Sequence, residues 1–268
     1  MMDGKRKKWW VYILLFFVSQ LAAVGMTMVL KTTKRTLTEG MEWTLVPALF
    51  AANALAIALF FAYRPENITW KGTVQGLCGR KGHRTLLMFL TALPLIALVN
   101  IIQEVFFPEL PDLVGEENFK AIMHNPLGLL TVAILGPIAE ELLFRGGVQT
   151  DFSRHHSDQG WFVPIAFSAL VFSLVHMNPA QLPIAFILGL VLGFAYWWTG
   201  SLAAPICIHV FNNSFACLLS YLSPDDDSIV SFLGGSTGTG VTVIICVFWL
   251  YLALRQVHKE GLGSLEKG

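Results

Sequence analysis

Long apolar runs separated by short polar connections dominate the chain. A helix needs about 20 apolar residues to cross a bilayer, whereas a signal-peptide core has only about 7–15. Trp9–Leu30, the first run, is 22 residues long and predicts a retained transmembrane helix. Seven further runs follow, the last of which could begin as early as Ile229: Trp43–Tyr63, Leu86–Phe107, Leu127–Val148, Trp161–Met177, Leu182–Trp198, Leu202–Leu222 and Val241–Leu254. The pattern predicts an all-α fold, a polytopic membrane helix bundle of about eight transmembrane helices.

The composition agrees with a bilayer environment. Hydrophobic residues make up 54% of the chain and charged residues 13%, whereas an average soluble domain is about one-quarter charged. Eighteen Lys and Arg balance 18 Asp and Glu, so there is no net charge to attract nucleic acid. We therefore expect an integral membrane protein that contacts the lipid bilayer and has no nucleic-acid partner.

Basic residues indicate which helix ends face the cytoplasm, because Lys and Arg collect on that side. They are frequent within Lys5–Lys8 and Arg64–Arg84, whereas the connections Glu109–Glu117 and Asp225–Asp227 on the opposite side are acidic. Both termini are therefore predicted to be cytoplasmic, and the absence of an organelle signal favours a bacterial cytoplasmic membrane. The basic residues within Lys31–Arg35 disagree, since they follow the first run on the predicted outer side.

No repeat, low-complexity tract or long linker divides the chain, so we predict a single transmembrane domain over residues 1–268. The four cysteines are too widely spaced for a zinc-type pair or a disulfide framework, and we expect them to be reduced and structural. Gly189 and Gly193 form a pair of small residues that lets two helices approach closely. We favour helix packing within the chain over a dimer interface as its role.

Three ionisable residues interrupt the fourth apolar run: Glu140, Glu141 and Arg145. An ionisable group at the centre of a membrane helix costs about 2.5–3.5 kcal/mol on insertion scales, so each one requires a reason. Glu141 and Arg145 are four residues apart, in the favourable order for an ion pair on one helix face. Glu140 is turned about 100° from Glu141 and is free for another role. An ion-pair cluster without chemistry, a transporter relay and a catalytic carboxylate all fit this pattern.

Two later runs add further polar side chains. His176 lies four residues after Phe172, and Asn213 lies four residues after His209, so each pair shares a helix face. A lone histidine in an apolar helix is more often a core residue than a catalyst, and His176, near the end of its run, fits that explanation. Packing alone, however, does not require this many polar groups in three membrane regions. We predict that His176, His209, Asn213 and Glu140 converge on one water-accessible cavity.

Depth in the membrane raises a difficulty for this convergence. Counted from Trp161, His176 lies about 22 Å along its helix, whereas Glu140 lies about 10 Å from the end of its own helix if that helix ends near Gly147. Continuation of the Glu140 helix past Arg145, or a bend at a proline such as Pro137, would bring the two side chains to one level.

Three motifs, in this order on apolar runs, resemble those of the CAAX prenyl protease and bacteriocin-processing family of intramembrane proteases: Glu140-Glu141-x-x-x-Arg145, Phe172-x-x-x-His176 and His209-x-x-x-Asn213. Each motif alone is weak, because Glu-Glu-x-x-x-Arg occurs by chance in soluble helices. The three together inside membrane runs are specific. The resemblance covers residues 127–218, roughly a third of the chain, which we expect to form a protease-like core.

The resemblance implies an endopeptidase that hydrolyses a peptide bond of a membrane-associated substrate, either a prenylated CAAX-type protein or a leader or bacteriocin-type peptide. The residues that match Glu140 and His176 would activate a water, and those that match His209 and Asn213 would stabilise the oxyanion. This assignment is chemically reasonable, because a carboxylate beside an imidazole can act as a general base and N–H groups stabilise developing negative charge.

The Glu141–Arg145 pair would orient these residues. A metal is the main mechanistic alternative, since two histidines and a glutamate are an ordinary zinc set. No His-Glu-x-x-His motif is present, and the resemblance favours a glutamate-activated water without a cofactor.

Two non-proteolytic functions remain open. A membrane immunity or scaffold protein could retain the same fold without catalysis, and a transporter could use the polar residues as an ion path. A transporter of this kind is expected to show inverted repeats with paired broken helices, and the sequence shows no such symmetry. The leading expectation is a glutamate-type intramembrane protease.

Overall fold

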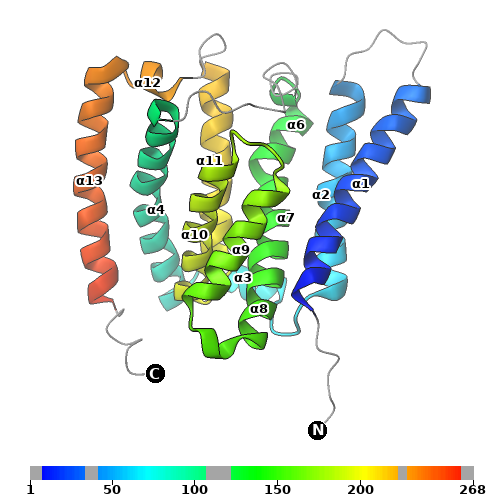
Figure 1. The fold of residues 1–268 in the computed structure, drawn as a ribbon, viewed down its shortest axis with the longest axis horizontal. Helices are drawn as coiled ribbons and strands as arrows, with labels where there is room; N and C mark the ends of the chain where they lie inside the picture. Colours follow the sequence, from blue (N-terminus) through cyan, green and yellow to red (C-terminus); the bar gives the residue numbers. More distant parts are fainter. Residues whose placement is uncertain (1–7, 34–41, 107–121, 223–227, 261–268) are drawn as a thin grey trace.

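The computed structural model describes residues 8–33, 42–106, 122–222 and 228–260, and these residues form helices and short turns without a strand. The long helices stand side by side as a bundle, with α13 at one edge and α1 with α2 at the other (Figure 1). Their bounds are as follows: α1 Trp9–Thr33, α2 Glu42–Tyr63, α3 Trp70–Gln75, α4 Gly79–Phe106, α6 Pro126–Leu130, α7 Gly136–Glu141, α8 Thr150–His155, α9 Phe162–Val175, α10 Leu182–Thr199, α11 Ala203–Leu222, α12 Ile229–Phe232 and α13 Gly235–Lys259.

Seven helices within the described ranges are long and apolar enough to cross a membrane, which confirms the predicted polytopic all-α membrane bundle. The remaining predicted span, Trp161–Met177, corresponds to α9, which is apolar but has only 14 residues. At 1.5 Å per residue, α9 is about 21 Å long, shorter than the bilayer core of about 30 Å. The predicted helix, which extended to Met177, is too long. The chain leaves the helical conformation after His176, and Met177 has a φ of 49°.

The span that carries Glu140 is continuous from Pro126 to His155. Asn125 starts it, since its side chain accepts hydrogen bonds from the backbone N–H groups of residues 127 and 128, and Pro126 occupies the first turn. Two π-helical segments, η1 (Thr131–Leu135) and η2 (Leu142–Gln149), flank α7. Such wide turns are rare and are frequent at functional sites.

The helix does not end near Gly147 but continues for two further turns, as one of the two resolutions of the depth difficulty required. Gly146 and Gly147 instead allow neighbouring helices to pack closely against it. A Cβ atom on Gly147 would lie 2.4 Å from the Tyr12 ring of α1, and one on Gly146 would lie 2.9 Å from the Phe60 ring of α2. The two glycines thus allow α1 and α2 to pack directly on the span that carries Glu140.

Gly189 and Gly193 lie on α10 at its contact with α9. A Cβ atom on Gly189 would lie 2.9 Å from the backbone of Ala169, and one on Gly193 would lie 2.9 Å from Ile165. This contact confirms the interpretation of the pair as helix packing within the chain. The four cysteines are free, and two of them are buried.

The beginning of α1 and the end of α13 lie at the same end of the bundle (Figure 1). This arrangement agrees with the predicted placement of both termini on one side, and the cytoplasmic identity of that side stays a prediction. The predicted acidic connections Glu109–Glu117 and Asp225–Asp227, and the basic residues Lys34 and Arg35, lie outside the described residues.

Candidate active site

A buried ion pair forms the base of the site. Oε1 of Glu141 accepts hydrogen bonds from Nη1 of Arg145 at 2.8 Å and from Nδ1 of His209 at 2.8 Å. Glu141 and Arg145 are fully buried, and His209 is 3% exposed. The carboxylate therefore connects two spans, since His209 comes from α11. Because Nδ1 donates to Glu141, the other ring nitrogen of His209 is directed elsewhere.

Arg145 has two further contacts that hold its position. Its Nη2 donates to the backbone carbonyl of Gly189 at 3.1 Å, and its guanidinium lies 4.5 Å from the centroid of the Phe172 ring. The Phe172 ring also contacts His209, with 5.7 Å between ring centroids. Phe172 thus packs against the site without contributing a polar group, and Arg145 contacts both α9 and α10.

Glu140 lies on the opposite side of the His209 ring from Glu141. Its Oε2 lies 3.7 Å from Nε2 of His209, and its side chain is 24% exposed, unlike the buried Glu141. The sequence-based expectation that adjacent glutamates take different surroundings is met in the structure. Glu141 holds His209 from behind, and Glu140 faces open space in front of it.

That space is a cavity of about 770 Å³. Its walls come from α1, α2, the central span, the end of α9 and α11, and they are mostly apolar. The polar side chains in its lining are Gln20, Thr27, Asn53, Thr131, Glu140, His176 and Asn213. Three of the four residues predicted to share a cavity therefore line it, and the fourth, His209, lies directly behind Glu140.

The two remaining site residues are oriented by backbone carbonyls. Nδ1 of His176 donates to the carbonyl of Phe172 at 2.7 Å. Since that nitrogen carries the proton, Nε2 of the neutral ring has a lone pair and can accept a proton. Nδ2 of Asn213 donates one hydrogen to the carbonyl of Val132 at 3.1 Å, which leaves its second hydrogen for another acceptor.

The depth difficulty disappears because the helix of Glu140 ends later than expected. This helix continues to His155, and the next helix, which leads to His176, begins directly after Trp161. Along the helix axes, both Glu140 to His155 and Trp161 to His176 correspond to about 22 Å. Helix continuation thus brings Glu140 and His176 to one level.

Sequence reasoning missed Gln149 as part of the packing around the site. Its Nε2 donates to the carbonyl of Gly193 at 3.0 Å, one helical turn beyond the Arg145–Gly189 contact. Two side chains four residues apart thus bind two glycine carbonyls four residues apart on α10. The sequence did contain a signal for this contact: Arg145 and Gln149 have the same four-residue spacing as Gly189 and Gly193. Glycine allows side chains of a neighbouring helix to reach its backbone carbonyl.

The donor set for a metal ion is incomplete in the described part of the chain. No group of three or more His, Cys, Asp or Glu residues there is arranged to hold a metal ion. Nδ1 of His209 and Nδ1 of His176 are both engaged in hydrogen bonds within the protein, which leaves only Nε2 of each ring available to a metal ion. The described residues therefore present no complete set of zinc ligands.

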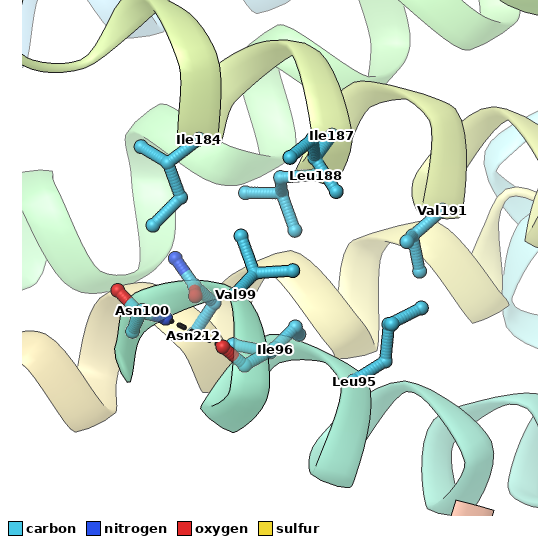
Figure 2. A pocket seen from close by; sticks show the side chains of 9 residues that line it. All are labelled: Leu95, Ile96, Val99, Asn100, Ile184, Ile187, Leu188, Val191 and Asn212. Atoms are coloured by element: carbon cyan, nitrogen blue, oxygen red, sulfur yellow. Dashed lines mark hydrogen bonds between the residues drawn. The ribbon is translucent and has the colours of Figure 1, made fainter. Parts of the chain in front are cut away.

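A second, much smaller cavity of about 10 Å³ lies between α4, α10 and α11 (Figure 2). Asn100 and Asn212 lie at one end of it among aliphatic side chains, and Asn100 donates to the carbonyl of Ile96 at 2.9 Å. The space is about that of one water molecule, so it is too small for a peptide. The larger cavity is the candidate active site.

Residues 122–215 match the family model described as type II CAAX prenyl endopeptidase, Rce1-like. All six predicted site residues fall in this segment, which contains 94 of the 268 residues. The match confirms the resemblance that the three motifs predicted.

Two bacterial relatives are similar over parts of their lengths. The membrane-embedded CAAX protease MroQ of Staphylococcus aureus is 31% identical over 103 residues, which are 37% of this chain and 42% of MroQ. YdiL of Bacillus subtilis, named as a candidate membrane peptidase, is 26% identical over 129 residues, which are 44% of this chain and 52% of YdiL. The chain spans about half the length of these curated relatives. No solved structure matches it. Together with the seven apolar helices, these matches identify an integral protein of a bacterial membrane.

Proposed function

We propose that this chain, whose residues 122–215 match the Rce1-like family, is an intramembrane endopeptidase that hydrolyses a peptide bond of a membrane-associated substrate. One observation carries the proposal: Glu140 lies in the wall of a large cavity with His209 directly behind it, and His176 and Asn213 line the same cavity. The names of the relatives add support, since one is a CAAX protease and the other a candidate membrane peptidase.

Glu140 and His176 are the proposed activators of the attacking water. The Glu140 carboxylate is partly exposed in the cavity, and Nε2 of His176 has a free lone pair in its neutral form. A water between them transfers a proton to one of these bases as its oxygen attacks the carbonyl carbon of the scissile bond. The same proton then moves to the departing amine nitrogen as the C–N bond breaks, which leaves a free carboxylate and a free amine.

His209 and Asn213 are the proposed donors to the oxyanion. Glu141 accepts the Nδ1 proton of His209, so the ring donates from Nε2 when it carries a second proton. Asn213 contributes the amide hydrogen that Val132 does not use. Donors fixed in advance toward developing negative charge are an effective means of lowering a barrier.

Cleavage by the purified protein in detergent tests the proposal. A fluorogenic library of lipidated and unlipidated apolar peptides serves as substrate, and the wild type is compared with Glu140→Gln. We expect the variant to lose about 10²–10⁴-fold in rate, the usual contribution of general acid–base catalysis. Glu104→Gln is the matched control. Glu104 is also partly buried in a membrane helix, but it binds the start of α12 and lies outside the cavity.

The outcomes separate the remaining alternatives. Loss of activity in Glu140→Gln but not in Glu104→Gln, without an effect of a chelator, supports a glutamate-activated water. Loss on chelation would instead favour zinc. Absence of cleavage across the library by the folded wild type would contradict the proposal and favour an immunity or scaffold role.

A further inference from the structure

Met177 has an unusual backbone conformation directly after His176. Its φ of 49° is the only positive value of a non-glycine residue in the described part of the chain. It follows the C-cap of α9, the position at which helices commonly place glycine in the left-handed conformation. The left-handed region is unfavourable for residues with a Cβ atom, so glycine would suit this backbone better.

Core packing does not explain why a methionine stands there. The residue is 69% exposed, which makes it one of the most exposed large apolar residues described. Its side chain lines the cavity that also contains Glu140 and His176. The apolar side chain is thus presented to the cavity beside the proposed catalytic histidine, on a backbone that disfavours any side chain.

We propose that Met177 is a specificity-determining residue that contacts a large apolar side chain next to the scissile bond of the substrate. This inference rests on the proposed function. Methionine suits the role, because its unbranched, polarisable side chain adapts to different apolar partners. The neighbouring wall of α1, with Leu21, Val24 and Met28, extends the apolar surface on which such a substrate would lie.

The Met177→Gly variant distinguishes the contribution of the side chain to substrate binding from that of the backbone conformation. Glycine adopts the left-handed conformation without strain, so the variant should unfold at a temperature at least as high as the wild type. We expect KM to rise about 10–100-fold for peptides with a large apolar residue beside the cleaved bond, the range for a lost apolar contact, with kcat changed less than about threefold. Met177→Leu should retain most of the wild-type KM, because it keeps a large apolar side chain.

Leu174→Ala is the matched control. Leu174 lies on α9 and is 56% exposed, but it does not line the cavity, so the KM of this variant should match that of the wild type. An unchanged KM in a folded Met177→Gly variant, or an equal rise in Leu174→Ala, would overturn the inference. A Glu140→Gln variant that keeps its activity would instead contradict the proposed function, so the two failures are distinguishable.

Discussion

Gly189→Ala tests how closely the site depends on the contact between α9 and α10. The added Cβ atom would lie 2.9 Å from both Cα and Cβ of Ala169, whereas ordinary contacts begin at 3.4 Å. The helices must therefore separate by the difference between these two distances, because a backbone atom cannot rotate away. Overpacking of this kind costs about 1–3 kcal/mol.

The same displacement would weaken the site. The Arg145–Gly189 hydrogen bond is already 3.1 Å long. A shift of α10 by about 0.5 Å away from the central span, which carries Arg145, would stretch it to about 3.6 Å, which is too long for a hydrogen bond. Arg145 also holds Glu141, which in turn holds His209. We therefore expect Gly189→Ala to lower both the free energy of unfolding and kcat.

Reversible denaturation in detergent micelles, followed by tryptophan fluorescence, measures the free energy of unfolding. Gly25→Ala is the control, since no atom beyond its own stretch of helix backbone lies within 4 Å of the added Cβ. It should leave stability unchanged or raise it by up to about 1 kcal/mol, because alanine is the better helix former. Gly193→Ala should fall between the two, as its new contacts include the movable end of the Gln149 side chain. Equal stability of Gly189→Ala and Gly25→Ala would refute the reasoning.

Individual contacts support three more predictions. Arg145→Met should lower the free energy of unfolding by about 3–5 kcal/mol, because it removes the buried cation that pairs with the Glu141 carboxylate and leaves only the hydrogen bond from His209. Adding Glu141→Gln should recover part of the loss in the same denaturation assay. Gln149→Leu should cost about 1 kcal/mol or less, as expected for one hydrogen bond between membrane helices; a loss comparable to that of Arg145→Met would contradict this ranking. The hydrogen bond to His83 lowers the pKa of Glu260, so this contact stabilises the fold above the ordinary carboxyl pKa and is lost as the pH falls through the lowered value. His83→Ala should raise that pKa in an NMR titration of the carboxyl carbon, and an unchanged pKa would show that the contact is not formed.

The class of fold was readable from the amino-acid sequence. Runs of about 20 apolar residues that cross a bilayer must form their backbone hydrogen bonds within helices, so the helical class and the order of the spans are visible without a structure. Only the short α9 departs from the predicted number of spans. The cost of ionisable groups in such runs also identified Glu140, Glu141 and Arg145 as residues that need an explanation. The motif spacing then related them to His176 and His209.

Helix ends were less predictable. A helix end near Gly147 was assumed for the depth of Glu140, yet Gly146 and Gly147 admit aromatic rings from α1 and α2, and the helix continues to His155. Glycine has both uses, and only the neighbouring helices decide between them. The early end of α9 before Met177 was likewise invisible in an uninterrupted apolar run.

The connections among the site residues depend on tertiary packing. Helical periodicity places Glu141 and Arg145 on one face, but it does not say which residues of other spans that face meets. The packing of α11 brings His209 to Glu141, and the packing of α10 brings the Gly189 carbonyl to Arg145. The cavity in front of Glu140 also depends on how α1 and α2 pack against the central span. These contacts join residues far apart in the chain, and their geometry depends on the angles and levels at which whole helices pack, which a pattern within one helix does not encode.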